Sequence, residues 1–313
     1  MKMTNGINVV KTEEKRRLEN LFTALKGKKI TILGHDNIDV DATLSGILMS
    51  KLLDFLNIEN QFTILEEVKK DDTYEIIEEL LGIDMKEWEV QEENEDREIF
   101  LVDHYETVHK GHVVGCIDHH PTKQKKSYEF MYTRNACAAA YLIYEIMKEV
   151  NFPIEKEIAK MVIVAMMVDT TSFRSSKTIT EEVEQAKKLA KEYNIDYSSL
   201  EKSCLCLTPI EKLSTTEIIS NGQKWYNYNE SKVGSAYLQL YGLPNEEKVN
   251  FWISSLKEKL NQTNSDMLVF IIFDTKSNKT YEYRVTKFGI QKFIKNGILS
   301  RGKDIMPVIE KMF

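Results

Sequence analysis

Residues 28–56 read KKITILGHDNIDVDATLSGILMSKLLDFL, and this stretch indicates how the chain folds. Its first part, KKITIL, is a short aliphatic run that ends at glycine and acidic residues, which predicts a strand followed by a loop. Its last part, DATLSGILMSKLLDFL, combines small and aliphatic residues, which favours a buried helix. The stretch therefore predicts a strand, a polar loop and a helix in that order.

The same unit recurs through the first two thirds of the chain. Strands are expected in QFTILE, REIFLVDHYE and HVVGCIDHH, which occupy residues 61–66, 97–106 and 112–120. The spacing of apolar residues predicts helices over residues 12–25, 71–82, 136–150, 154–173 and 179–195. Alternating strands and helices predict an α/β fold, a doubly wound and mainly parallel sheet. In such folds ligands bind beyond the carboxyl ends of the strands.

The last third of the chain has a different pattern. Residues 232–243 read as a strand, 250–262 as a helix and 266–286 as a hairpin with a polar turn. A second, smaller α/β domain is expected from this pattern. We expect three parts, an N-terminal helical extension over residues 1–27, a main domain over 28–207 and a second domain over 208–313.

Composition excludes several classes of protein. The 313 residues carry a net charge of -7 with 42% hydrophobic side chains, as in an ordinary folded protein and unlike a disordered chain. A chain with a net negative charge has no overall positive potential that would attract duplex nucleic acid. An anionic substrate therefore has to be bound by local cations or metal ions. No apolar run approaches the roughly 20 residues that span a bilayer. Four cysteines without CxxC spacing indicate reduced, mostly buried thiols, and a cytoplasmic protein is expected.

Metal-ligating side chains gather at three predicted strand ends. Six histidines lie within the first 120 residues, and four of them lie within two residues of an aspartate, whereas His109 and His112 are expected to be structural. GHDNIDVD supplies His35, Asp39 and Asp41, a set of one imidazole and two carboxylates that suits Mn²⁺, Mg²⁺, Zn²⁺ or Co²⁺. The alternative interpretation of this loop is a helix cap from one of the two aspartates.

Further acids and histidines extend this set. They are Asp103 with His104, Asp118 with His119 and His120, and Asp169 after an uninterrupted apolar run. Carboxylates gathered at one sheet edge repel each other unless divalent cations compensate their charge. Two metals held by a bridging carboxylate, roughly 3.5 to 4 Å apart, would activate water and stabilise phosphoryl oxygens.

Four segments in this order resemble the motifs of the DHH phosphoesterase superfamily: GHDNIDVDAT, LVDHYE, CIDHHP and MVDTTSF. Near the end of the chain, ILSRGKDIMPVIEKMF resembles the Ser-Arg-Lys-Lys signature of the manganese-dependent (family II) inorganic pyrophosphatases. ISNGQKWYNYNESKVGSAYLQL is similar to their segment with a phosphate-binding lysine, and FRSSKTITEEVEQAKKLA to their Phe-Lys-Ser-Pro-Thr stretch. The glycine-and-histidine motif of DHH nucleases is missing. The resemblance covers residues 28–313.

The resemblance implies two divalent metals, expected to be Mn²⁺, with Mg²⁺ or Co²⁺ as alternatives. It implies that one metal is held by His35, Asp39 and Asp103, and the other by Asp41, Asp103, His119 and Asp169. Asp103 would be the bridge, and His104 and Asp118 would orient ligands. His120 would contact substrate as a candidate acid, and the phosphates would be bound from the second domain by Lys224, Arg301 and Lys303. For these three cations the alternative is solvated surface charge.

The chain departs from the family pattern at three positions. Ile38 stands where the family usually has proline, and Val40 where it has a small or hydroxyl residue. Gly302 replaces the first lysine after the signature arginine, so one phosphate contact is absent unless Lys303 replaces it.

The expected function is therefore metal-dependent hydrolysis of a phosphoanhydride, with pyrophosphate as the first candidate substrate. One alternative is a DHH phosphoesterase for a short oligonucleotide, a nucleotide 3′-phosphate or polyphosphate, which Gly302 favours. Another is a weakly catalytic protein that responds to phosphate or nucleotides. The expected partner is a small phosphate-containing substrate, with no membrane and no duplex nucleic acid, and the resemblance also allows a homodimer.

Overall fold

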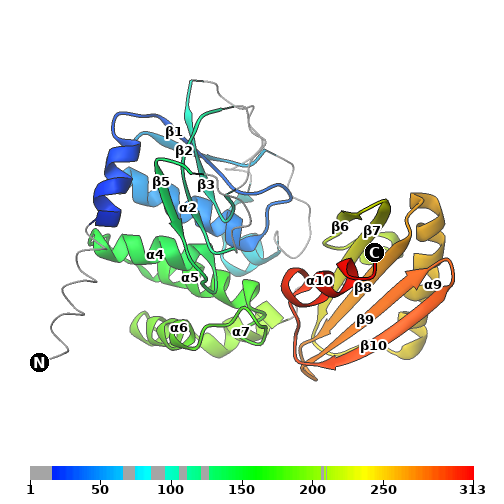
Figure 1. The fold of residues 1–313 in the computed structure, drawn as a ribbon. Helices are drawn as coiled ribbons and strands as arrows, with labels where there is room; N and C mark the ends of the chain where they lie inside the picture. Colours follow the sequence, from blue (N-terminus) through cyan, green and yellow to red (C-terminus); the bar gives the residue numbers. More distant parts are fainter. Residues whose placement is uncertain are drawn as a thin grey trace, which may run out of the picture. The chain divides into compact units, whose positions relative to one another are not determined.

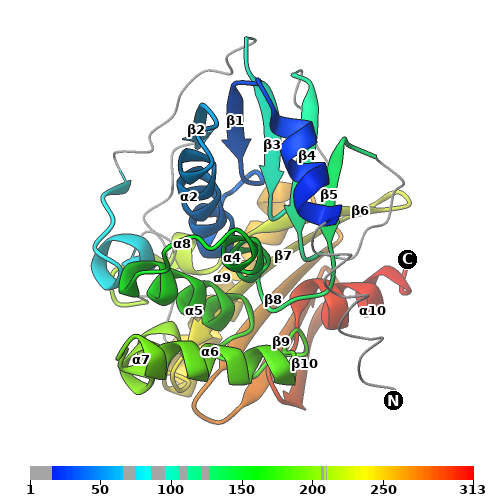
Figure 2. The same ribbon diagram turned by 90° about the vertical axis from the view of Figure 1, so that its left-hand side faces the viewer.

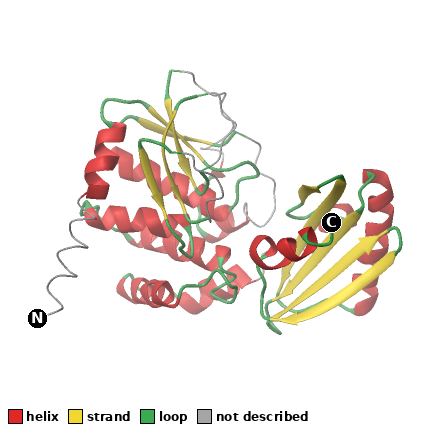
Figure 3. Cartoon of the chain, viewed as in Figure 1, coloured by secondary structure: helices red, strands yellow, loops and turns green. Residues whose placement is uncertain are grey.

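The computed structural model describes residues 16–65, 75–85, 96–105, 111–120, 127–205, 208 and 210–313. Several expectations fall outside these residues, namely the first residues of the N-terminal helix (12–15), the start of the helix over 71–82 (71–74), His109 and Cys206. The chain divides into two compact units, and each is described by itself. Figure 3 shows that both units combine helices with a sheet.

The division differs from the boundary expected at residue 208. The first unit contains Met1–Asp169 and Ile179–Tyr197, and the second contains Thr170–Thr178 and Ser198–Phe313. The second unit thus begins before residue 208 and also takes a short segment from the middle of the chain. Within it, Ser175 forms an isolated parallel bridge with Ile298, which attaches this segment to the C-terminal part of the chain.

The first unit is built on a five-stranded sheet in which every pair of neighbouring strands is parallel. Its strands are β1 (Ile30–Leu33), β2 (Asn60–Thr63), β3 (Glu98–Val102), β4 (Val113–Asp118) and β5 (Phe130–Thr133). They lie in the order β2-β1-β3-β4-β5, one of the doubly wound orders, as Figure 2 shows; Figure 1 shows the same sheet from another side. The expected doubly wound parallel sheet is therefore confirmed.

Two short helical segments of this unit are an α-helix over residues 16–25 and a π-helical turn, η1 (Glu75–Leu80). The longer ones are α2 (Val40–Phe55), α4 (Ala139–Glu149), α5 (Lys156–Asp169) and α6 (Thr180–Glu192). Helix α2 packs against α4 and α5, and α6 packs against α5 (Figure 2). Asp39 caps α2, and the first ten residues of that helix are all buried, so this helix passes through the centre of the unit.

Helix α2 approaches the sheet closely at Gly46. A Cβ built at this glycine would lie 2.1 Å from Cε2 of Phe62, a buried residue of β2. Glycine is required here because the ring occupies the space that any side chain would fill. The predicted strand, loop and helix of residues 28–56 are thus present as β1, the loop and α2.

The second unit has a five-stranded sheet of mixed direction. Its strands are β6 (Lys224–Tyr228), β7 (Ser231–Leu240), β8 (Met267–Asp274), β9 (Lys279–Thr286) and β10 (Gly289–Asn296), in the order β10-β9-β8-β7-β6. Strands β7 and β8 are parallel and are joined through helix α9 (Glu246–Thr263), whereas β8 and β9 form the expected antiparallel hairpin. The second α/β domain is therefore present.

Separate hydrophobic clusters stabilise the second sheet. One includes Trp252 of α9 with Phe270 of β8, and the other includes Ile305 and Ile309 near the C-terminus with Val269. The remaining helical segments are α7 (Tyr197–Leu205), α8 (Thr215–Ile218), a π-helical turn η3 (Arg301–Ile305) and α10 (Met306–Glu310). Among the described residues, no helix is both long enough and apolar enough to cross a membrane.

Candidate metal centre

The strand order of the first unit predicts where a ligand binds. From β1 the chain goes to β2 on one side, whereas β3, the next strand along the chain, pairs with the other side of β1. Such a change of direction opens a crevice at the carboxyl ends of the two strands. His35 follows β1 and Asp103 follows β3, so both side chains lie at this switch point. His119 and His120 follow the adjacent strand β4.

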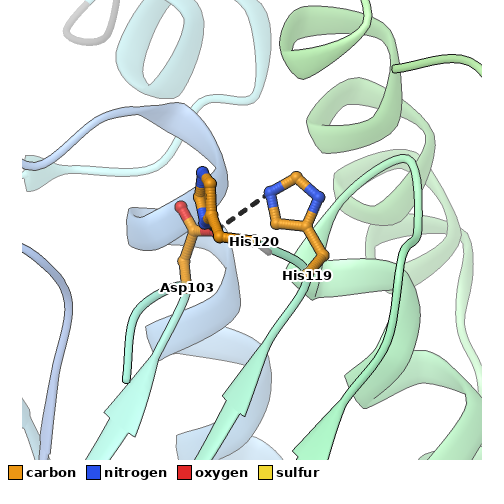
Figure 4. A group of neighbouring side chains, drawn as sticks. All are labelled: Asp103, His119 and His120. Atoms are coloured by element: carbon orange, nitrogen blue, oxygen red, sulfur yellow. Dashed lines mark ion pairs between the residues drawn. The ribbon is translucent and has the colours of Figure 1, made fainter. Parts of the chain in front are cut away.

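Asp103 is shared by two groups of side chains, one that contains His35 and one that contains His119. Its Oδ2 lies 3.5 Å from Nε2 of His35, and its Oδ1 lies 3.2 Å from Nε2 of His119. In Figure 4 the imidazoles of His119 and His120 lie beside the Asp103 carboxylate. The backbone of Asp103 is left-handed, with φ of 62°, a conformation that is strained for a residue with a side chain. This carboxylate can therefore serve two groups, one through each oxygen.

The first group consists of His35, Asp39 and Asp103, whose ligand atoms lie within 4.8 Å of one another. Nδ1 of His35 lies 2.8 Å from the carbonyl oxygen of Asp36. Because a carbonyl oxygen only accepts, Nδ1 carries the proton and Nε2 is left as a metal ligand. The two carboxylate oxygens of Asp39 have different partners. Oδ1 accepts a hydrogen bond from the amide of Ala42, and Oδ2 lies 3.4 Å from Nε2 of His35. It is thus both the helix cap and a candidate ligand.

The second group surrounds His119, which is buried. Its Nδ1 lies 2.9 Å from the carbonyl oxygen of Ala136, so Nδ1 donates and Nε2 again faces the acids. Besides Asp103, Nε2 lies 3.6 Å from Oδ2 of Asp169 and 3.7 Å from Oδ2 of Asp41. Asp169 is the last residue of helix α5. These distances bring together the four residues that the family resemblance implies for the second metal.

Asp41 is held in place by the start of a neighbouring helix. Its Oδ2 accepts from the amide of Ala139 at 2.7 Å, and its Oδ1 accepts from the amide of Ala140 at 3.0 Å and from Ser45 at 3.2 Å. Backbone amides at a helix N-terminus stabilise a negative charge. This carboxylate is therefore oriented before any ligand binds.

His120 has a different environment from His119. Oδ1 of Asp118 accepts from Nδ1 of His120 at 2.9 Å and from its backbone amide at 3.1 Å. The His120 side chain is 41% exposed, whereas Asp118 is fully buried. Asp118 thus orients a histidine that a substrate can reach. Nδ1 of His104 lies 3.0 Å from the carbonyl oxygen of Val102, and its ring meets that of His35 edge-on.

The electrostatics of the cluster favour added positive charge. Burial opposes the protonated form of His119, but Asp169, Asp103 and Asp41 outweigh it and raise the pKa of His119 to about 10. Burial would likewise lower the pKa of His35, but Asp39 and Asp103 raise it well above its ordinary value. Divalent cations would satisfy the same carboxylates and bind neutral imidazoles.

Unsatisfied polar atoms also point to a bound cation. Among the described residues, the buried side-chain atoms of this cluster without a hydrogen-bond partner include Oδ1 of Asp103, Oδ2 of Asp118 and Nε2 of His119. Buried polar atoms are rarely left in this state. Two of the three belong to the expected ligands, so the donor set fits a metal ion, and oxygen and imidazole ligands suit Mn²⁺, Zn²⁺ and related divalent ions.

The cations expected to bind phosphate lie in the second unit. Lys224 is the first residue of β6 and is exposed. Nη1 of Arg301 donates to the carbonyl oxygen of Gly222, two residues before Lys224, and the guanidinium lies 5.0 Å from the ring centre of Tyr237. Lys303 is half-buried in the same turn of helix as Arg301. Arg301 and Lys224 are therefore both tied to one short turn.

Sequence reasoning missed two features of the site. The backbone amides of Ala139 and Ala140 hold Asp41, and residue type carries no signal for such a role. The chain also follows Asp169 with three left-handed residues in succession, Thr171, Ser172 and Phe173. None is glycine or asparagine, the residues that usually mark this conformation, so the turn could not be predicted.

Comparisons with known proteins agree with the fold and with the resemblance to DHH phosphoesterases. Residues 29–166 match the model of the DHH family, N-terminal domain. This part of the chain is similar to a DHH domain. The match includes β1 to β4 and the residues from His35 to His120 that gather around Asp103. The resemblance to DHH phosphoesterases is thereby confirmed.

Two relatives of similar length are named manganese-dependent inorganic pyrophosphatase. The manganese-dependent inorganic pyrophosphatase of Methanocaldococcus jannaschii is 24% identical, and the match covers 90% of this chain and 98% of that protein. The manganese-dependent inorganic pyrophosphatase of Bacillus subtilis is 25% identical, with the same shares covered. The similarity therefore extends beyond the DHH domain into the second unit.

Solved structures show the same fold. The crystal structure of a putative family II inorganic pyrophosphatase from Methanococcus jannaschii matches with a TM-score of 0.69 at 23% identity, over 90% of this chain and 98% of that one. An exopolyphosphatase-related protein from Bacteroides fragilis matches with a TM-score of 0.51 at 14% identity, over 95% and 96%. At these identities the likeness describes the fold alone.

Proposed function

We propose that this protein hydrolyses a phosphoanhydride, with inorganic pyrophosphate as substrate and two orthophosphates as products. The observation that carries the proposal is the Asp103 carboxylate, whose two oxygens face Nε2 of His35 and Nε2 of His119. A carboxylate shared in this way suits a binuclear metal centre. The relatives named manganese-dependent inorganic pyrophosphatase, which this chain matches over almost their full length, support the choice of substrate and of Mn²⁺.

Two Mn²⁺ ions fit the proposed ligands, with Mg²⁺ or Co²⁺ as alternatives. The first would be held by His35, Asp39 and Asp103, and the second by Asp41, Asp103, His119 and Asp169. When bound, such ions lower the pKa of water and neutralise charge on phosphoryl oxygens. The chain itself holds both histidines with Nε2 toward the acids, because Nδ1 of each donates to a backbone carbonyl.

His120 is the proposed acid for the leaving phosphate. Its Nδ1 donates to buried Asp118, so Nε2 is the atom available to exchange a proton with substrate. The Asp118 carboxylate keeps the His120 ring in one orientation. Exposure of the His120 side chain is consistent with this contact.

Lys224, Arg301 and Lys303 are proposed to bind the phosphates. An arginine fork can contact two phosphate oxygens at once, whereas lysine acts as a point charge. In the second unit, Arg301 leans against the turn before Lys224, which supports a joint role for these two side chains.

One observation favours a second candidate, a DHH phosphoesterase acting on polyphosphate, a nucleotide 3′-phosphate or a short oligonucleotide. A Cβ built at Gly302 meets no atom within 4 Å, so this position leaves room beside Arg301 that a lysine would fill. A larger substrate could use that room. The net charge of -7 argues against duplex nucleic acid as a partner.

Phosphate release distinguishes these functions. The chain would be freed of metal, supplied with Mn²⁺ or Mg²⁺, and given pyrophosphate, polyphosphate, a nucleotide 3′-phosphate or a short oligonucleotide at equal phosphate concentration. The proposal expects pyrophosphate to have the highest kcat/KM, with Mn²⁺ the better ion. Faster turnover of another substrate would support the second candidate. Binding of phosphate or nucleotides without turnover of any substrate would support a regulatory protein.

We also propose that the protein acts in the cytoplasm and that two copies form a homodimer, as the resemblance allows. Cell fractionation tests the first proposal, and sedimentation equilibrium of the full chain tests the second. A single species with the mass of one chain at micromolar concentration would exclude a stable dimer.

A further inference from the structure

Lys259 makes three hydrogen bonds to one short turn of the second unit. It lies in helix α9, and its Nζ donates to the carbonyl oxygen of Ile219 at 3.2 Å, to Oγ of Ser220 at 2.7 Å and to Oε1 of Gln223 at 2.7 Å. These three acceptors lie along residues 219–223, which we call the 219–223 turn. An ammonium group has three donors, and here each has an acceptor. Lys259 therefore has no donor left for a substrate anion.

The acceptors are themselves well ordered by the surrounding structure. Oγ of Ser220 donates to the carbonyl oxygen of Thr216 at 2.6 Å, which leaves its lone pairs for Lys259. The amide of Gln223 donates to the carbonyl oxygen of Ser220 at 3.0 Å. Lys259 is half-buried, and burial lowers its pKa, so its hydrogen bonds replace contacts with water. The three hydrogen bonds of Lys259 therefore hold the 219–223 turn in place.

The same turn positions two of the cations assigned to phosphate. Gly222 has a φ of 55°, and its carbonyl oxygen accepts from Nη1 of Arg301. A Cβ at Gly222 would lie 2.4 Å from the ring of Tyr237, the ring over which Arg301 is stacked. Lys224 directly follows the turn and begins β6, where it is in register with Ser235 of β7. A shift of the turn would therefore move both cations.

We propose that Lys259 is a positioning residue, which holds the 219–223 turn so that Arg301 and Lys224 are placed to bind the phosphates of the substrate. This inference rests on the proposed function for its substrate, but the contacts that carry it belong to the second unit alone. Lys259 acts through the turn, since its own donors are all used within the protein.

The test compares Lys259→Met with Lys257→Met. Both changes remove one positive charge from helix α9, but Lys257 is exposed and lies two residues away from Lys259. In Lys259→Met, KM for pyrophosphate should rise about tenfold, the effect of a weakened charge-assisted contact, while kcat and bound Mn²⁺ per chain change little. Lys257→Met should keep the KM of the unaltered chain. An unchanged KM in Lys259→Met, or a matching loss of Mn²⁺, would overturn the proposal.

A double-mutant cycle with Arg301→Gln separates positioning from general stabilisation. If Lys259 acts by placing Arg301, the rise in KM caused by Lys259→Met should be much smaller when Arg301 is already replaced. If the two substitutions raised KM independently, so that their fold-changes multiplied in the double variant, Lys259 would not act through Arg301. That result would contradict the inference.

The cycle also works if pyrophosphate is not the substrate. Absence of pyrophosphate hydrolysis by the unaltered chain would refute the proposed function. The positioning role would then be tested by urea unfolding of the unaltered chain, the two single variants and the double variant. Coupling between the two sites should remain in their unfolding free energies, because Lys259, the turn and Arg301 are in contact without substrate. Additive unfolding effects would then overturn the inference.

Discussion

Nε2 of His119 faces Oδ1 of Asp103 at a distance of 3.2 Å, and both atoms are buried. The other oxygen of Asp103 faces His35, which belongs to a different strand end and a different loop. The parallel sheet makes this possible, because β1, β3 and β4 are neighbours and end at the same edge. Asp103 is thus the residue on which both halves of the candidate metal centre depend.

Replacing Asp103 should therefore impair both metals together. In Asp103→Asn, Mn²⁺ affinity should fall more than the roughly 10- to 100-fold typical of residues that only orient a ligand. Metal analysis after equilibrium dialysis should show less than one Mn²⁺ per chain under conditions that fill both sites of the unaltered protein.

Asp36→Asn is the matched control for that change. Asp36 lies in the same loop as Asp39, and its side chain is exposed, so this variant loses one acidic charge without losing a proposed ligand. It should bind Mn²⁺ as the unaltered chain does. If Asp103→Asn lost only one ion and kept the other at full affinity, the shared role of Asp103 would be wrong.

Gly302→Lys tests the substrate through the anion-binding residues. The position has open space, so the substitution introduces no clash at Cβ, and it restores the lysine of the family signature. A charge-assisted hydrogen bond contributes about 1.5 to 3 kcal/mol, so kcat/KM for pyrophosphate should rise tenfold or more. No gain on pyrophosphate, together with a loss on a nucleotide ester, would instead indicate a site shaped for the larger substrate.

Gly46→Ala tests the close approach of α2 to β2. Alanine favours a helix by about 1 kcal/mol relative to glycine, whereas overpacking a core costs about 1 to 3 kcal/mol. With the new methyl group 2.1 Å from Cε2 of Phe62, we expect the clash to dominate and the free energy of unfolding in urea to fall. Gly302→Ala, at a position with open space, is the control. A more stable Gly46→Ala protein would show that the Phe62 ring moves aside at little cost.

Three buried cysteine thiols should resist modification at mildly alkaline pH. Burial raises the pKa of Cys116 and of Cys137 to about 12 each, and Cys204 is also buried. A thiol whose folded pKa is raised stays protonated until the pH approaches that value, so at pH 9 only about one molecule in a thousand carries the reactive thiolate. A coloured disulfide reagent at pH 9 should therefore titrate at most one of the four thiols before urea is added. Rapid reaction of two or more in the folded chain would contradict this.

The regular parts of the fold could be predicted from local patterns. An aliphatic run before GHD and small residues after it are sufficient to predict β1 and α2, and the β8–β9 hairpin follows from its polar turn. The gathering of His35, Asp103 and His119 could also be predicted, because parallel strands end at one edge of the sheet. These predictions depend only on chain periodicity and on a general property of sheets.

The division between the two units could not be predicted in the same way. Thr170–Thr178 joins the second unit through contacts such as Ser175 with Ile298, more than a hundred residues away. No glycine or proline marks that segment as part of another unit. Residues brought together by tertiary contacts leave little local signal, and the amides that hold Asp41 are a second example.

The measurement that bears most directly on the central claim is a titration of the metal-free chain with Mn²⁺, in which bound metal and pyrophosphate hydrolysis are followed in the same samples. We predict no hydrolysis without metal, saturation at two Mn²⁺ per chain, and full activity only as the second ion binds. Hydrolysis by the metal-free chain, or saturation with full activity at one Mn²⁺ per chain, would contradict a binuclear centre bridged by Asp103.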